Sequence, residues 1–302
     1  MSKSPNALLI ISKLRIINAN SISGPLTWGF PSPTAFTGFI HALSRRLNDK
    51  TVLDGVGIVC HSFEPQVNGG KYEKRFKLTR NPIYGRDVTK PSGIVEEGRT
   101  HLTVTIVAGV YGDEPSAEEI AKLIGSMRVA GGSVVYQQKQ NVEIVSLPQY
   151  AEEDEKIFRK LRRKLVPGFA LIDRTDLMLE RMNEMKAGNP DVSLLDVLLD
   201  LTALKHAPVM DDEEKAVWTT YREKQGWLVP LPVGYAGISP LYEPGEVKNT
   251  RDQETPFRFT ETAYSVGEWK NPFKINNIED FLWFHKAEPD KGIYLCGHKK
   301  LY

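Results

Sequence analysis

The first 150 residues predict an α+β fold of the ferredoxin-like class, to which RNA-recognition motifs (RRMs) also belong. Two observations lead to this prediction: apolar runs of strand length alternate with two amphipathic helical segments, and the order of these segments is β-α-β-β-α-β. A third observation is a long basic segment, residues 64–100, between the second and third expected strands. The predicted architecture is a βαββαβ palm over residues 1–150 with a thumb insertion at 64–100, followed by a mixed C-terminal half.

Four segments are expected to form the sheet of the palm, because β-branched and apolar side chains fit a pleated, half-buried surface. They are Ala7–Ile17, Val56–Phe63, His101–Val110 and Val142–Leu147. The second and third are expected to be neighbours in the sheet, yet hairpin loops usually contain about 2–5 residues. The segment between them is far longer, which marks it as an insertion.

Two helices are expected between these strands. Ser32 is a good N-cap and Pro33 a good first residue of the first helix. Apolar side chains follow at the spacing of one helix face: Phe36, Phe39, Ile40, Leu43 and Leu47. The second helix is expected to open with a capping box at Ser116–Glu119 and to end before Gly131.

Residues 151–302 predict a mixed helical and irregular region packed on the palm. Three helices and one short strand are expected in its first part: Lys156–Leu165, Phe169–Asp173, Thr175–Ala187 and Ser193–Leu204. The apolar segment Trp227–Val233 contains Pro230 and Pro232, which argue against a regular central strand. Ile278–Lys286 is expected to close the fold as an apolar helix.

The composition argues against several classes of protein. The chain has 302 residues and a net charge of +1, so any nucleic-acid-binding face must be local. Its two cysteines, Cys60 and Cys296, form no C-x-x-C pair, which argues against a zinc site or a disulfide framework and fits a reducing cytosol. No apolar stretch approaches the ~18 residues of a membrane span. We expect a cytoplasmic protein with no membrane contact, no metal and no cofactor.

The basic insertion is the main functional signal of the sequence. Between residues 71 and 90, seven Lys or Arg residues stand against only Glu73 and Asp87, with three aromatic residues among them. Cations can bind phosphates while aromatic rings stack on bases, so this composition suits a strand of nucleic acid. The alternative is a solvated insertion with no ligand. The expected contacts here are Arg75, Lys77, Arg80 and Arg99, with Phe76 and Tyr84 for stacking.

Further candidate contacts lie outside the insertion. Asn18 and Asn20 follow the first expected strand and either hydrogen-bond base edges and phosphates or serve only as turn residues. Trp28 either stacks on a base or is buried. Four arginines are further candidates for binding phosphates. Arg162 and Arg163 could instead belong to a solvated helix end. Arg251 and Arg258 could instead form intramolecular salt bridges.

The histidines suggest an alternative function. His61 and His101 flank the insertion, so an RNA-processing endoribonuclease could use them as acid and base, with Lys71 as the electrophile. Such chemistry requires these groups to surround one phosphate. The sequence does not establish that proximity, and the competing hypothesis is that both histidines are structural.

Eight segments are distinctive together and follow one another along nearly the whole chain. They are residues 18–39, Leu53–His61, Leu78–Pro82, Ile94–Arg99, Leu165–Leu171, Gly226–Pro230, Ser239–Val247 and Ala287–Gly292. In this order they resemble the second-subunit family of the type I-F CRISPR surveillance complex, the Csy complex.

The resemblance implies a repeat-associated mysterious protein (RAMP) without catalytic activity. It implies that the chain holds the 5′ handle of the CRISPR RNA beside the large subunit that reads the protospacer-adjacent motif. The thumb would reach the first backbone subunit, target DNA would be met through the complex, and a different subunit would cut the guide RNA. An endoribonuclease acting on CRISPR repeat RNA is the alternative. Four tryptophans are expected either in the core or at a partner interface: Trp28, Trp227, Trp269 and Trp283.

Overall fold

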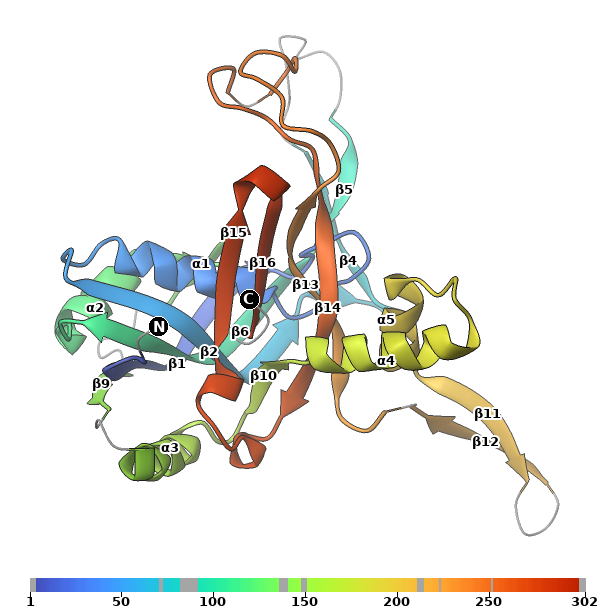
Figure 1. The fold of residues 1–302 in the computed structure, drawn as a ribbon, viewed down its shortest axis with the longest axis horizontal. Helices are drawn as coiled ribbons and strands as arrows, with labels where there is room; N and C mark the ends of the chain where they lie inside the picture. Colours follow the sequence, from blue (N-terminus) through green and yellow to red (C-terminus); the bar gives the residue numbers. More distant parts are fainter. Residues whose placement is uncertain are drawn as a thin grey trace. The chain divides into compact units, whose positions relative to one another are not determined.

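A computed structural model describes residues 4–70, 73–81, 92–135, 141–147, 151–210, 215–222, 224–250 and 252–298 (Figure 1). The backbone divides into two compact units, Met1–Gly168 and Phe169–Tyr302. Each unit has its own set of antiparallel strands.

The N-terminal unit is organised around β1, which spans Ala7–Asn20. Along one edge β1 pairs with β6 (Arg99–Gly112), and β6 pairs in turn with β2 (Thr51–Pro65). The first five residues of β1, Ala7–Ile11, are almost completely buried. They are apolar throughout, as expected for a strand covered on both faces.

The other edge of β1 is shared by two strands. β9 (Asn141–Ser146) pairs with the first half of β1, and β8 (Gly132–Val134) pairs with its second half. β8 forms a tight hairpin with β7 (Arg128–Val129). The last residues of β1, next to β8, also line the polar groove described below.

Three α-helices belong to the N-terminal unit. α1 (Pro33–Ser44) begins as predicted, because the Ser32 side chain caps it, and it contacts β2. Four residues of its predicted apolar face are buried, whereas the fifth, Leu47, lies beyond the end of the helix and is only partly buried. α2 (Ala117–Ile124) follows Ser116, but the Ser116 side chain makes no capping hydrogen bond. The predicted capping box is therefore wrong. α3 spans Ala151–Lys164.

The basic insertion forms a small sheet of its own. β3 (Val67–Asn68), β4 (Arg75–Arg80) and β5 (Ile94–Glu97) pair antiparallel in that order. Phe76 is the one buried residue of β4, while its charged neighbours are exposed. The described part of the insertion is therefore an ordered ribbon that presents cations.

The C-terminal unit contains a five-stranded antiparallel arrangement among the described residues. In spatial order the strands are β10 (Phe169–Asp173), β14 (Thr260–Lys270), β13 (Leu228–Gly237), β16 (Ile293–His298) and β15 (Trp283–Glu288). Short 3-10 turns occur between them: Pro272–Lys274, Glu279–Phe281 and Pro289–Lys291.

Two helices and a separate ribbon complete the C-terminal unit. α4 (Thr175–Gly188) and α5 (Leu194–Thr202) contact each other and pack on β14, and α5 also packs on β13. β11 (Lys205–Met210) and β12 (Ala216–Tyr221) form a two-stranded sheet. The core beneath the helices consists of Met178, Val197, Leu198, Leu201, Leu228 and Val266.

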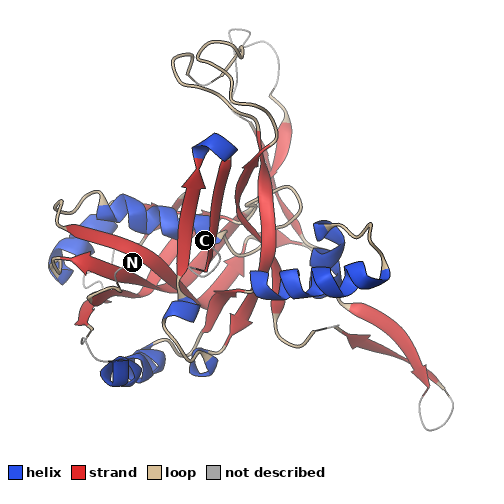
Figure 2. Cartoon of the chain, in the orientation of Figure 1, coloured by secondary structure: helices blue, strands red, loops and turns tan. Residues whose placement is uncertain are grey.

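The ferredoxin-like, RRM-like palm is wrong as the fold class of this chain. The described residues form sixteen strands and five α-helices, so the molecule is mostly antiparallel sheet with few helices (Figure 2). The prediction failed because the insertion and the C-terminal half, expected to be loop-rich or helical, supply many of the strands. The prediction also missed the hairpin of β7 and β8, because strands of two and three residues are too short to show a periodic pattern in the sequence.

Two C-terminal predictions are corrected by sheet pairing. Pro230 and Pro232 lie within β13, where the described ladder runs to β14 alone, because β16 pairs with β13 only from Gly234 onward. A proline is tolerated where no ladder hydrogen bond is needed. The expected helix at 278–286 is a 3-10 turn followed by β15, and Trp283 is buried, with its indole N–H donating to the Leu171 carbonyl at 2.8 Å.

Leu14→Ala should lower the free energy of unfolding by about 2–5 kcal/mol, because Leu14 is completely buried in β1 and its removal leaves a cavity. Leu78→Ala is the matched control, since Leu78 lies exposed on β4, and it should change stability by about 0.5 kcal/mol at most. Urea unfolding measures both. Equal losses for the two variants would contradict the assignment of β1 to the core.

Candidate nucleic-acid interface

A polar groove lies beside the last residues of β1 in the N-terminal unit. Its volume is about 370 Å³, and three of its lining side chains are cations against one acid. The lining residues are Asn18, Gln66, Lys77, Glu97, Arg99, Arg128, Gly131 and Ser133. They come from β1, the link between β2 and β3, the small sheet of the insertion, the start of β6 and the β7–β8 hairpin, so the groove collects residues from distant parts of the sequence.

Asn18 reaches the groove because β1 is irregular at this point. The register with β6 shifts between Ile16 and Ala19, and Asn18 has a φ of 56°. Asn is among the few residues that adopt this left-handed conformation readily. The Asn18 backbone N–H donates to Nδ1 of His101 at 3.3 Å, and its side-chain Oδ1 lies 2.8 Å from Nε2 of Gln66. Asn18 is therefore the centre of a polar network.

Arg99 is fixed at the start of β6 by two neighbours. It forms an ion pair with Glu97, to which its Nε donates at 2.8 Å, and its Nη1 donates to the Asn18 carbonyl at 3.2 Å. The guanidinium has five donors, so these bonds orient it without using all of them.

Lys77 and Arg128 are the cations of the groove that remain available. Neither forms an ion pair among the described residues. Arg128 lies on β7, and this hairpin can approach β1 because residue 132 is glycine: a Cβ there would lie 2.7 Å from the Ala19 nitrogen. The sequence prediction missed Arg128. The tight Ala130-Gly131-Gly132 turn after it was the available signal.

The other expected contacts of the insertion are arranged differently. Arg75 pairs with Glu73 on the surface, and Nη1 of Arg80 donates to the Ser92 carbonyl at 3.4 Å. Phe76 is buried and meets the Trp28 ring edge-to-face, with the ring centroids 5.1 Å apart. Trp28 itself is 50% exposed, so it can offer a ring face while Phe76 supports it.

Several predicted contacts have structural partners outside the groove. The Asn20 side chain bonds both backbone groups of Ile22, at 2.7 and 3.1 Å, as a turn residue does. The Arg162 guanidinium lies over the Phe158 ring, 5.0 Å from its centroid, whereas Arg163 is exposed at the end of α3.

In the C-terminal unit, Arg258 donates from Nη1 to the Pro289 carbonyl at 3.0 Å, so it ties the residues before β14 to a 3-10 turn. Arg251, Tyr84 and Lys71 lie outside the described residues. Of the four tryptophans, Trp283 is in the core, while Trp28 and Trp227 are about half exposed.

His61 is held in a chain of hydrogen bonds. The Lys13 backbone N–H donates to the Thr105 hydroxyl at 3.1 Å, and that hydroxyl lies 2.7 Å from Nε2 of His61. Nδ1 of His61 donates to the Pro167 carbonyl at 2.5 Å, since a carbonyl only accepts. Burial, aided by the charge of Lys13, lowers the pKa of His61 below its ordinary value, against the opposing effect of the Pro167 bond.

His61 and His101 do not converge on one site. His61 contacts Thr105, whereas His101 contacts Asn18 and Gln66. Thr105 and His101 are four residues apart on β6, which corresponds to ~13 Å along a strand. The acid–base pair of the endoribonuclease hypothesis is therefore not assembled by this arrangement.

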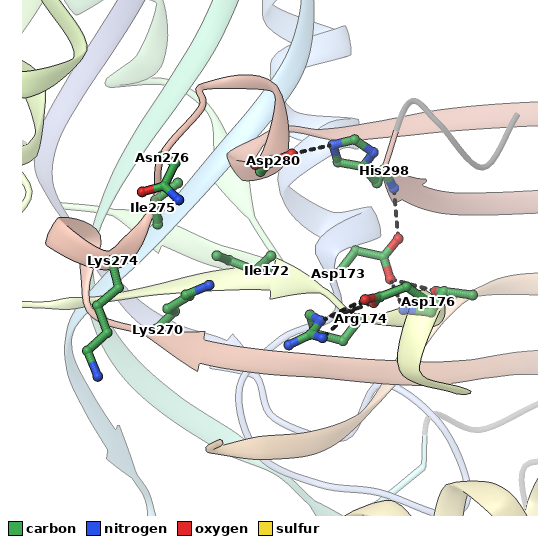
Figure 3. Close-up of a pocket in the computed structure, with 11 residues that line it drawn as sticks. Ile172, Asp173, Arg174, Asp176, Lys270, Lys274, Ile275, Asn276, Asp280 and His298 are labelled. Atoms are coloured by element: carbon green, nitrogen blue, oxygen red, sulfur yellow. Dashed lines mark hydrogen bonds and ion pairs between the residues drawn. The ribbon is translucent and has the colours of Figure 1, made fainter. Parts of the chain in front are cut away.

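A second pocket of about 370 Å³ lies within the C-terminal unit (Figure 3). The polar groups that β10 and the start of α4 bring to it serve internal contacts. Asp173 accepts hydrogen bonds from the Thr175 backbone and hydroxyl at 2.9 and 2.6 Å and from the His298 backbone at 2.8 Å. Arg174 pairs with Asp176 at 3.0 Å and with Glu268 at 2.6 Å. The contacts around this pocket connect β10, α4, β14 and β16, so these side chains have a structural role.

No group of three or more His, Cys, Asp or Glu residues in the described ranges is arranged to hold a metal ion. None of the helices in the described part of the chain is long and apolar enough to cross a membrane.

Comparison with known proteins agrees with the resemblance seen in the sequence segments. A family model described as "CRISPR-associated protein (Cas_Csy2)" matches residues 9–296. The chain is 47% identical over 312 residues to the CRISPR-associated protein Csy2 of Pseudomonas aeruginosa (strain UCBPP-PA14). That alignment covers 96% of this chain and 94% of the relative.

His61→Gln should reduce the loss of unfolding free energy that occurs as the pH is lowered. The pKa of His61 is lower in the folded chain than its ordinary value of 6.5, so below about pH 6.5 the unfolded chain binds more protons and the folded state loses stability as the pH falls. The difference in unfolding free energy between wild type and variant should therefore shrink from pH 7 to pH 5. Urea unfolding across this range tests it, with the exposed His206→Gln as control, and parallel profiles for wild type and His61→Gln would refute it.

Proposed function

Because the chain belongs to the Csy2 family of CRISPR-associated proteins, whose members are subunits of the type I-F Csy complex, we propose that it holds the 5′ handle of the CRISPR RNA in the polar groove. One observation supports this proposal. Lys77 and Arg128 form no ion pair among the described residues, and they line the same groove as Arg99 and Asn18. Unpaired cations beside amides suit a phosphodiester strand, which offers charge and hydrogen-bonding groups together.

Each groove residue has a role that its chemistry suggests. Lys77 and Arg128 bind backbone phosphates, since their charge is not already neutralised. Arg99, oriented by Glu97, presents its remaining N–H donors. Asn18 and Gln66 carry amides that can pair with the edge of a base. The half-exposed Trp28 ring, supported by Phe76, is a platform on which an unpaired base can stack.

The proposed role is binding without catalysis. Both ring nitrogens of His61 are engaged by Thr105 and Pro167, and burial lowers its pKa, which disfavours the protonated ring. His101 lies in a different network. An RNA-cleaving pair would need both rings at one phosphate, and this separation favours a holder of RNA over a nuclease.

The chain is further proposed to join the large subunit, which reads the protospacer-adjacent motif, to the first backbone subunit, and to meet target DNA through the complex. Exposed leucines on α4 and α5 support a protein-binding role, because large apolar side chains left in water are covered when a partner binds. These side chains are Leu179, Leu194, Leu195 and Leu199.

The double variant Lys77→Gln/Arg128→Gln should bind handle RNA more weakly at every sequence, because each lost phosphate contact removes one released counterion. The slope of log affinity against log salt should become shallower by about one unit per cation. Fluorescence anisotropy with a handle oligonucleotide, at several salt concentrations and with the chain in its assembled complex, measures both effects.

Lys122→Gln is the matched control, because Lys122 is an exposed lysine of α2, outside the groove. It should leave both the affinity and the slope unchanged. If the double variant bound RNA as tightly as Lys122→Gln, the groove would not be the RNA site. The chain would then be better described as an adaptor between proteins.

A further inference from the structure

The ribbon formed by β11 and β12 has no packing role that the described structure explains. Its strands pair in unbroken register from Lys205 opposite Tyr221 to Met210 opposite Ala216, and among the described residues they pair only with each other. Figure 1 shows the ribbon extending away from α4, α5 and the other strands of the C-terminal unit. None of its twelve strand residues is buried.

Both faces of this ribbon are apolar near its far end. Trp218 stands opposite Pro208 on one face, and Val209 stands opposite Val217 on the other. Trp218 is 70% exposed and Met210 66% exposed. An isolated two-stranded ribbon is only marginally stable in water, and large exposed apolar side chains carry a solubility cost. A partner that covers both faces would remove both costs.

The charges identify the chemistry of this partner. From His206 to Met210 and from Ala216 to Tyr221 the strands contain no Lys, Arg, Asp or Glu. In the sequence, the four residues that follow Met210 are Asp-Asp-Glu-Glu. The Lys and Arg residues of the ribbon lie only at the ends of its strands: Lys205 begins β11, Lys215 precedes β12 and Arg222 follows it. Nucleic acid is bound mainly through cations, so the uncharged middle of these strands, next to a run of acids in the chain, offers little to phosphates. A protein surface with apolar walls and cations at its rim is complementary to it.

We propose that the β11–β12 ribbon inserts into an apolar, basic-rimmed cleft of another protein subunit of the complex, with Trp218 as its anchor. Tryptophan is a frequent hot-spot residue because it buries a large area with few rotamers. This inference rests on the chain's place in a multi-subunit complex but not on the RNA groove. The proposal for the ribbon and the proposal for the groove can therefore be refuted independently.

The test is the affinity of the purified chain for the remaining subunits assembled with CRISPR RNA. Trp218→Ala should weaken this association by about 30-fold, as expected for a hot-spot residue. Trp218→Phe should stay within about threefold of wild type because it keeps an aromatic anchor. Leu241→Ala, another half-exposed apolar residue of this unit, is the control and should have no effect.

Two further measurements decide between the possible occupants. Thermal unfolding of Trp218→Ala should match wild type, since the residue is exposed, and its affinity for isolated handle RNA should be unchanged. A benzophenone amino acid in place of Val217 should crosslink to one of the other protein subunits. Crosslinking to RNA or to a second copy of this chain, no crosslink at all, or wild-type association of Trp218→Ala would each overturn the proposal.

Discussion

The pairing of β1 along both of its edges is the constraint on which the N-terminal unit depends. One edge is occupied by β6, while the other is divided between β9 and β8. Where both faces of the sheet are covered as well, every side chain of the strand must be apolar, which accounts for the buried run Ala7–Ile11. The same strand must bend to serve two partners, and it does so at Lys13 and Asn18, both with positive φ at register shifts. The second of these irregularities places Asn18 in the groove.

The two exposed features of the chain differ in the forces they can supply. The groove gathers Lys77, Arg99 and Arg128 around amides, so its interactions are electrostatic, weakened by salt and largely indifferent to sequence. The β11–β12 ribbon has almost no charge in its strands and offers Trp218 and its neighbours, so its interactions depend on apolar burial. A subunit that binds both RNA and protein can use these two surfaces without competition between them.

Two polar side chains outside the groove and the ribbon are held by internal hydrogen bonds, as is usual for buried polar groups. His61 connects the Thr105 hydroxyl to the Pro167 carbonyl, and Asp173 connects the start of α4 to β16. Such residues look chemically promising in a sequence because their types are those of active sites. Their partners show that they hold strands and helices together instead.

The sequence by itself determined the first helix, several of the strands and the family. Ser32 and Pro33 marked the start of α1, the spacing of Phe36 and Phe39 marked its buried face, and the segments from residue 18 to Gly292 identified the Csy2 resemblance. Local signals of this kind depend on neighbours in the chain, which a sequence contains. The excess of cations in the insertion was equally visible.

Only the tertiary structure decided the fold class, the groove and the roles of single side chains. Pairing partners far apart in sequence turned Leu228–Gly237 and Trp283–Glu288 into strands, although prolines and an apolar run suggested otherwise. Arg128 became a groove residue because Gly132 lets the β7–β8 hairpin lie close to β1, whereas the Asn20 side chain bonds Ile22 in its own turn. The physical reason is common to these cases: a side chain's role depends on which distant groups satisfy or leave unsatisfied its charge and hydrogen bonds, and sequence spacing does not contain that information.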